Sequence, residues 1–208
     1  MTGVQRPTWL VWVAGVAAIA ATARLGWWQL DRAAQKVEME SIQAQRALAP
    51  ALQPGDLPRD ATAAAVAEHR RAAVQGRWLA SHTVFLDNRP LAGHAGFFVL
   101  TPLDLDDGRV LLVQRGWWPR DAVNRTRIAA PAPPSGRVAV LGRVALGVSR
   151  QYELGADAGG PIRQNLDLQA FARETKLKLL PWLLVQLDDA AGPPVGDGLD
   201  RRWPAPAS

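Results

Sequence analysis

The sequence predicts an α+β fold that is mainly β. An N-terminal transmembrane helix is expected first, followed by a small, mostly antiparallel sheet or barrel-like domain with one or two helices. An uncharged apolar run near the start predicts the transmembrane helix. Beyond Pro50 the apolar residues fall into short runs bounded by Gly, Pro and Asp, a pattern typical of strands. The predicted strands cover residues 72–79, 83–88, 96–105, 109–118, 137–145 and 182–187.

The composition limits the chemistry that the chain can carry. Its 208 residues include 24 Lys and Arg against 19 Asp and Glu, a net charge of +5, and 48% of them are hydrophobic. This balance is typical of one folded domain with an appendage rather than of a disordered chain. The sequence contains no cysteine, which excludes disulfides, iron–sulfur sites and thiol nucleophiles. His69, His82 and His94 are the only imidazole groups.

Residues 1–24 are predicted to form a membrane anchor. From Pro7 to Ala23 the chain carries no charge, and this run meets the lower limit of about 17 apolar residues for a spanning helix. Trp9 and Trp12 are then expected at one membrane interface. A cleaved signal peptide is the alternative, with the small residues 21–23 as its cleavage site. We favour the anchor, because the residues that follow do not resemble the start of a mature chain.

Residues 25–49 are predicted to continue the anchor as an amphipathic helix. Apolar or small residues recur in steps of three and four from Trp27 to Leu48, the spacing of one helical stripe. Trp27 and Trp28 are expected at the level of the lipid headgroups. One basic residue precedes the apolar run and three follow it closely. The positive-inside rule, taken alone, would therefore place the rest of the chain in the cytoplasm.

The mainly β domain is expected to cover residues 50–190. Gly108 can adopt the positive φ that a tight hairpin needs between the two middle strands. The three prolines between residues 129 and 136 predict a loop, and Asp167 is expected to cap a late helix. Residues 191–208, rich in Pro and Gly, are predicted to be a tail outside the domain.

Two histidines are candidate ligands for haem or a metal. His82 and His94 lie near the two ends of one predicted strand. Without a third ligand at metal spacing, two solvated histidines are the more common arrangement, and no metal site is predicted. Ser81, His82 and Asp87 are the residue types of a catalytic triad, but no nucleophile elbow or oxyanion loop accompanies them. No phosphate-binding loop or dinucleotide motif is found either, so no enzymatic activity is predicted.

Arg89 and Arg115 each lie at the end of a predicted strand, and Trp117 follows the second of them. In one interpretation the three residues form an exposed patch that docks to a membrane partner or to the propionates of a haem. In the other, the arginines satisfy internal carbonyls or Asp87, and the tryptophan packs in the core. We expect docking for Arg115 and architecture for Arg89. Single-stranded nucleic acid also suits Arg and aromatic residues, but the membrane segment argues against it.

Six blocks of sequence, in this order and with this spacing, form a pattern that is specific enough to be compared with a known family. They are Leu25-Gly26-Trp27-Trp28-Gln29-Leu30-Asp31-Arg32, Val74-Gln75-Gly76-Arg77-Trp78, Leu86-Asp87-Asn88-Arg89, Gly96-Phe97-Phe98-Val99-Leu100-Thr101-Pro102-Leu103, Leu112-Val113-Gln114-Arg115-Gly116-Trp117 and Ile162-Arg163-Gln164-Asn165-Leu166-Asp167. The chain that contains these blocks resembles the surfeit locus protein 1 family from residue 9 to residue 206. The resemblance implies an assembly factor for haem-copper cytochrome c oxidase. Such a factor helps haem a to reach oxidase subunit I and has no established catalytic reaction.

The resemblance also implies partners and a location. The expected partners are oxidase subunit I, the machinery of haem a synthesis and membrane lipid, with haem a as transient cargo rather than a tightly bound cofactor. Family members carry two transmembrane helices and hold their soluble domain on the outer side of the membrane, which overrules the charge count given above. Only six residues precede the apolar run, too few for a mitochondrial transit peptide. We therefore expect a bacterial inner membrane, with the domain in the periplasm.

The chain departs from the family pattern at its C-terminal end. No second apolar run follows the tail, so the chain is either truncated or a single-pass member. No histidine matches the candidate haem ligand of the family, and the resemblance therefore assigns no haem-binding residue here. The competing functional hypothesis is a membrane-anchored extracytoplasmic ligand-binding domain with no role in oxidase assembly.

Overall fold

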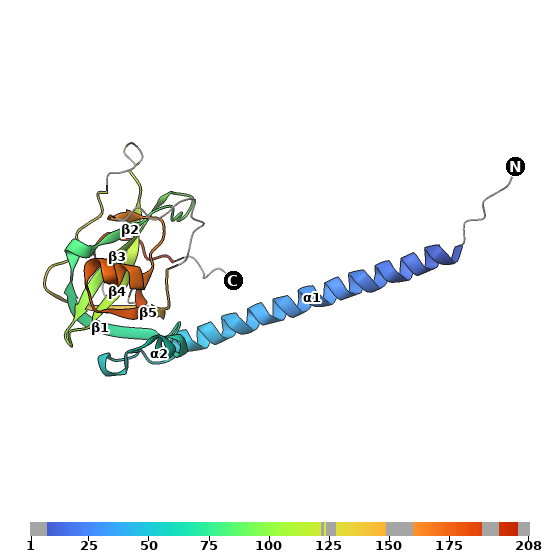
Figure 1. Cartoon of the computed structure of the whole chain (residues 1–208), viewed down its shortest axis with the longest axis horizontal. Helices are drawn as coiled ribbons and strands as arrows, with labels where there is room; N and C mark the ends of the chain where they lie inside the picture. The colour runs from blue at the N-terminus through green and yellow to red at the C-terminus, as the bar shows by residue number, and fades with distance from the viewer. Residues whose placement is uncertain (1–7, 122, 124–127, 149–159, 189–195, 204–208) are drawn as a thin grey trace. The chain divides into compact units, whose positions relative to one another are not determined.

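The computed structural model describes residues 8–121, 123, 128–148, 160–188 and 196–203. The chain divides into two compact units, one ending at Ala44 and the other beginning at Gln45. The first unit contains most of one long helix, and the second contains the strands (Figure 1).

Helix α1 (Thr8–Leu48) is continuous, which confirms that the helix predicted at the apolar run extends into the segment after it. Its tryptophans are exposed: Trp9 by 62%, Trp12 by 77%, Trp27 by 78% and Trp28 by 56%. Within the described residues, no helix is both long enough and apolar enough to cross a membrane. The transmembrane helix expected at residues 7–23 is therefore not confirmed, since its apolar run is rich in alanine and ends at a charged residue.

Five strands of the second unit close into a barrel (Figure 1). Around the ring they follow the order β1–β5–β7–β4–β3, and β3 pairs with β1 to close it. Every pairing in the ring is antiparallel except that of β4 with β7. The predicted barrel-like, mostly antiparallel domain is thus confirmed. The five strands are β1 (Arg71–Trp78), β3 (Gly96–Leu105), β4 (Val110–Pro119), β5 (Arg137–Ala145) and β7 (Leu179–Gln186).

Two short strands extend the sheet beyond the barrel. β2 (Val84–Leu86) pairs with β3, and β6 (Ile162–Arg163) pairs in parallel with β2. The sequence analysis missed β6, because a strand of two residues carries no readable alternation. The short helices are η1 (Pro54–Asp56), α2 (Ala61–Val66) and η2 (Ala80–His82).

Alternate residues of the strands fill the barrel interior, because successive side chains of a strand point to opposite faces. Val74, Leu111 and Leu184 belong to this cluster, which also contains Trp182. Trp182 is completely buried and donates its indole N–H to the Pro58 carbonyl at 2.9 Å. The hydrogen bond satisfies the one polar atom of the largest side chain in the core.

A second apolar cluster lies on the outer face of β3, β4 and β7 and is covered by α3 (Leu168–Thr175). Phe171 is the buried residue of this helix. Asp167 caps the helix as predicted, because its carboxylate accepts a hydrogen bond from the Ala170 N–H at 2.7 Å. The domain therefore has two cores that share the same three strands.

The described residues 196–203, assigned to the tail by the sequence analysis, are packed against the barrel. The Trp117 N–H donates to the Asp200 carbonyl at 2.7 Å, and the Asp200 N–H donates back to the Trp117 carbonyl at 3.0 Å. The Trp203 ring lies edge-on to Phe98 at 5.5 Å, and its indole N–H donates to the Gln186 carbonyl at 2.7 Å. The sequence analysis ended the domain at residue 190. Residues 196–203 nevertheless belong to the domain, since they form hydrogen bonds with barrel strands.

The interior packing generates a prediction at Gly142. A Cβ there would lie 2.5 Å from Leu184 Cγ and 2.7 Å from the Val185 carbonyl oxygen, whereas a Cβ at Gly147 would meet nothing within 4 Å. Gly142→Ala should lower the free energy of unfolding by about 1–3 kcal/mol through overpacking. Gly147→Ala is the matched control and should leave it nearly unchanged. Urea unfolding measures both, and an equal response would contradict the assigned packing.

Candidate functional site

Arg115 is the extra residue of a β-bulge in β4. Leu100 of β3 pairs with Gln114, and the preceding Val99 pairs with Gly116, so Arg115 has no partner residue in the ladder. Bulges of this kind redirect a side chain that regular alternation would place elsewhere. Here the Arg115 side chain is completely buried, and its guanidinium lies over the ring of Trp78 at 5.2 Å.

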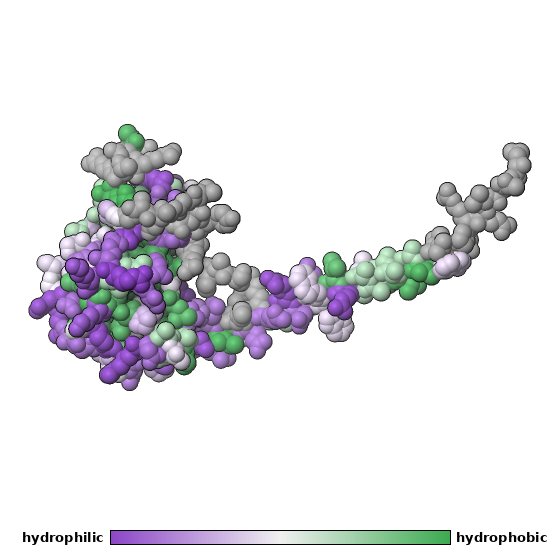
Figure 2. All heavy atoms as spheres, viewed as in Figure 1, coloured by the Kyte–Doolittle hydropathy of each residue, from purple (hydrophilic) through white to green (hydrophobic). Residues whose placement is uncertain are grey.

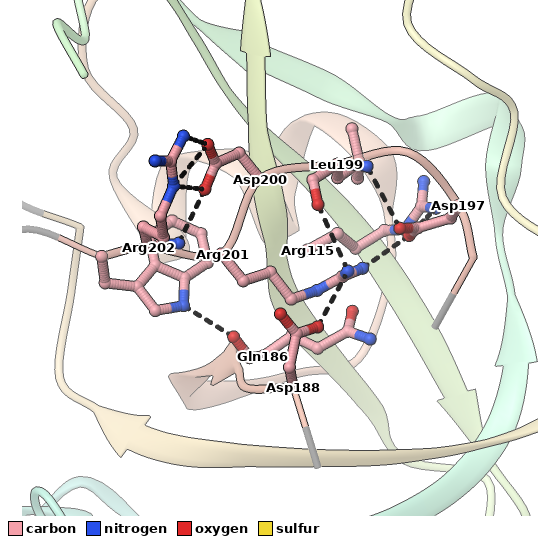
Figure 3. Close-up of polar contacts among 9 residues, drawn as sticks. Arg115, Gln186, Asp188, Asp197, Leu199, Asp200, Arg201 and Arg202 are labelled. Carbon is pink, nitrogen blue, oxygen red and sulfur yellow. Dashed lines mark hydrogen bonds and ion pairs between the residues drawn. The ribbon is translucent and has the colours of Figure 1, made fainter. Parts of the chain in front are cut away.

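The guanidinium of Arg115 is neutralised by a carboxylate far away in sequence (Figure 3). Arg115 Nη2 donates to Asp197 Oδ2 at 2.9 Å, and Arg201 Nη2 donates to the same oxygen at 2.6 Å. The exposed fractions of the three side chains are 1%, 4% and 3%. We call this group of Arg115, Asp197 and Arg201 the arginine clamp.

A more exposed carboxylate completes the charge balance of the arginine clamp. Asp188 is 56% exposed, and its Oδ1 accepts a hydrogen bond from Arg201 Nη1 at 3.3 Å. Burial lowers the pKa of the Arg115 guanidinium, while the charge and the hydrogen bond of Asp197 oppose that shift. Two arginines thus face two carboxylates, and only one of the four side chains reaches solvent to any large extent.

Close backbone contact brings the arginine clamp together. A Cβ at Gly116 would lie 2.4 Å from Leu199 Cβ, so only glycine permits the segment with Asp197 to approach β4 this closely. The backbone of Trp117 and Asp200 then forms a two-hydrogen-bond bridge. The bulge, the glycine and the bridge lie next to each other on β4, and together they fix the C-terminal segment over Arg115.

Arg89 and Trp117 are also buried, with exposed fractions of 2% and 8%. Arg89 Nη2 donates to the Gln164 carbonyl at 2.7 Å, and the guanidinium lies over the Phe98 ring at 5.7 Å. The Trp117 indole N–H donates to the Arg89 carbonyl at 2.6 Å. Burial lowers the pKa of the Arg89 guanidinium. Within the described part of the chain, Arg89 forms no ion pair, and its Nε and Nη1 have no hydrogen-bond partner.

The predicted docking patch of Arg89, Arg115 and Trp117 is therefore wrong as an exposed surface. The structure does bring Arg89 and Trp117 together, but inside the domain, and Arg115 is turned toward the arginine clamp. Asp87 does not hold Arg89 as expected, because its carboxylate pairs with Arg120. The architectural interpretation applies to both arginines: Arg89 donates to an internal carbonyl, one of the partners expected from the sequence, whereas Arg115 pairs with Asp197, which was not expected.

The two candidate histidines lie in separate turns. His82 ends η2, where its Nδ1 is 3.1 Å from Ser81 Oγ. His94 lies in a turn in which its backbone pairs with Leu91, and its side chain is exposed. Among the described residues there is no group of three or more His, Asp or Glu that could hold a metal ion. Asp87, the acidic residue considered for a triad with Ser81 and His82, forms its ion pair with Arg120.

The sequence analysis missed Asp197 and Arg201. Arg115 and Asp197 are 82 residues apart, and no local spacing signals a pairing over that distance. The one available signal was the dense charge of Asp197, Asp200 and Arg201 in a segment otherwise rich in Gly and Pro. The arginine clamp has a structural role, because its charged groups bond one another and so hold the C-terminal segment against the barrel.

The arginine clamp predicts a large loss of stability for Asp197→Asn. The change leaves two buried guanidinium groups without a full counter-charge, and breaking a buried ion pair in this way typically costs about 3–5 kcal/mol. Asp188→Asn is the matched control, since Asp188 also pairs with Arg201 but is half exposed, and should cost less than about 1 kcal/mol. Urea unfolding of the full chain measures both. Equal losses would contradict the buried role of Asp197.

Comparison with known proteins agrees with the resemblance seen in the sequence blocks. The SURF1 family model matches residues 16–207, a range that includes most of α1, the whole barrel and the arginine clamp. No curated protein matches the chain significantly. Because the family model covers nearly the whole chain, this protein belongs to the SURF1 family, which is known for cytochrome oxidase assembly.

Proposed function

We propose that this chain is an assembly factor for haem-copper cytochrome c oxidase and that it assists the delivery or insertion of haem a into subunit I. The observation that carries the proposal is the family match over residues 16–207. In this proposal haem a is transient cargo. The partners are subunit I and the machinery of haem a synthesis.

The buried arginines of the domain have a structural role. Arg115 and Arg201 direct their charges to Asp197, and Arg89 donates to a backbone carbonyl. These groups hold the barrel and its C-terminal segment in one arrangement. A rigid domain of this kind suits a factor that presents or receives a partner and performs no reaction of its own.

We further propose that the apolar half of α1 attaches the chain to the bacterial inner membrane, with the barrel on the periplasmic side. Figure 2 shows apolar residues gathered along the N-terminal half of α1. Its exposed large apolar side chains include Val16, Ile19, Leu25 and the four tryptophans. A contiguous apolar surface of this size marks contact with lipid or with another protein. Tryptophans on such a helix are typical of the membrane interface.

Deletion of the gene tests the proposed function. The deletion should lower cytochrome c oxidase activity in membranes and lower the haem a bound to subunit I, and expression of the full chain should restore both. Haem a is measured by its absorption spectrum in purified oxidase, and subunit I by immunoblot. In wild-type cells the full chain should co-purify with subunit I.

Two controls make this experiment specific. The Gly147→Ala chain should rescue the deletion fully, because that glycine has open space around it. An oxidase of another haem type in the same membranes should keep its activity. Normal haem a content and normal oxidase activity in the deletion strain would contradict the proposal.

A further inference from the structure

The outer face of the β1–β5 ladder carries four arginines. In the register of this antiparallel pair, Arg71 lies opposite Arg143 and Arg77 lies opposite Arg137. The inward neighbours of these residues, among them Val74, fill the core, so the arginines belong to the opposite face. The two strands together contain no Asp or Glu. We call Arg71, Arg77, Arg137 and Arg143 the arginine face.

Like charges directly opposite each other destabilise a sheet, so this arrangement is unfavourable for folding alone. Within the described part of the chain, Arg71 and Arg77 form no ion pair. Arg137 forms an ion pair with Asp106 in which both side chains are more than half exposed.

Two further acidic groups lie near the arginine face. Burial lowers the pKa of the Arg143 guanidinium, and the charge of Glu68 opposes that shift. Asp104 of β3 lies opposite Arg77 in the ladder. Arg46 and Arg70 also lie at the Arg143 end of the face, where their guanidinium groups donate to the Glu68 and Pro50 carbonyls. Basic groups therefore outnumber acidic ones along the whole face.

Four uncharged residues of this face lie between the two arginine pairs, and three of them are apolar. Ala73 lies opposite Leu141, and both are half-buried. Gln75 lies opposite Ala139, and both are exposed. The pairs are six residues apart along each strand, which corresponds to about 20 Å. A surface with uncharged side chains at its centre and cations at both ends fits a broad anionic surface better than a single small anion.

We propose that the arginine face binds the anionic headgroups of phospholipids and so docks the barrel on the membrane surface. The proposal rests on the membrane attachment by α1 proposed above. A helix that holds the chain at a bilayer keeps the face at high effective concentration beside lipid phosphates, so a modest patch is sufficient. Guanidinium groups suit the ligand, since they bind phosphate oxygens through paired hydrogen bonds.

Site-specific quenching tests the proposal with the full chain. The sequence contains no cysteine, so Gln75→Cys places a single fluorophore at the centre of the arginine face, and Arg173→Cys places one on the exposed surface of α3. Each labelled chain is bound to vesicles of phosphatidylcholine, with or without phosphatidylglycerol, that contain a headgroup quencher. We expect quenching at position 75 several times stronger with phosphatidylglycerol than without it, and little quenching at position 173.

Charge variants identify the residues responsible. Arg71→Gln with Arg143→Gln should abolish the quenching at position 75 that depends on phosphatidylglycerol. Arg173→Gln with Lys178→Gln removes the same charge from exposed positions elsewhere and should leave it intact. Added salt should weaken the effect, because it shortens the range of the attraction. Circular dichroism of each variant confirms that the fold is kept.

Three outcomes would overturn the proposal. One is equal quenching at positions 75 and 173, and another is quenching that persists in the Arg71→Gln and Arg143→Gln variant. The third is no quenching together with a loss of oxidase assembly in that variant, which would instead assign the face to an acidic protein partner. Failure of the full chain to bind neutral vesicles would contradict the proposed attachment by α1 but not the proposal for the arginine face. The two failures can be told apart, because quenching by anionic vesicles is measured separately.

Discussion

Asp197 joins the C-terminal segment, residues 196–203, to β4 of the barrel. Its carboxylate neutralises Arg115 and Arg201 in an interior where all three side chains are at least 96% buried. A buried ion costs several kcal/mol unless it is paired and hydrogen bonded. Each of the three residues is therefore tolerated only because the others are present. Closing residues 196–203 over β4 and burying Arg115 are consequently a single event in folding.

Local backbone features make this long-range pairing possible. The bulge at Arg115 takes its side chain out of the regular alternation, and Gly116 leaves room for Leu199. The neighbouring Trp117 bonds Arg89 on one side and the Asp200 backbone on the other. These contacts tie Arg89, Trp117 and the C-terminal segment to the same stretch of β4.

The sequence predicted the regular part of the fold well and the buried charges poorly. Alternation gave β3 and β5 their observed bounds, and an acidic cap located the start of α3, because these signals are local. Arg115 and Trp117 were predicted to be part of an exposed patch. Whether Arg115 is exposed or buried depends on the bulge in β4 and on Asp197, 82 positions away. Neither leaves a periodic trace in the sequence. The hydropathy of residues 7–23 predicted a membrane span, and its alanine content weakened that signal.

Hydrogen exchange of the full chain is the most direct test of whether the C-terminal segment is an integral part of the barrel. The account predicts that the amides of Trp117 and Asp200, which bond each other's carbonyls, exchange as slowly as those of the central barrel strands. Such exchange occurs only through global unfolding. Fast exchange at Asp200 beside a protected barrel would show that the segment opens on its own, and would contradict the central role given to Asp197.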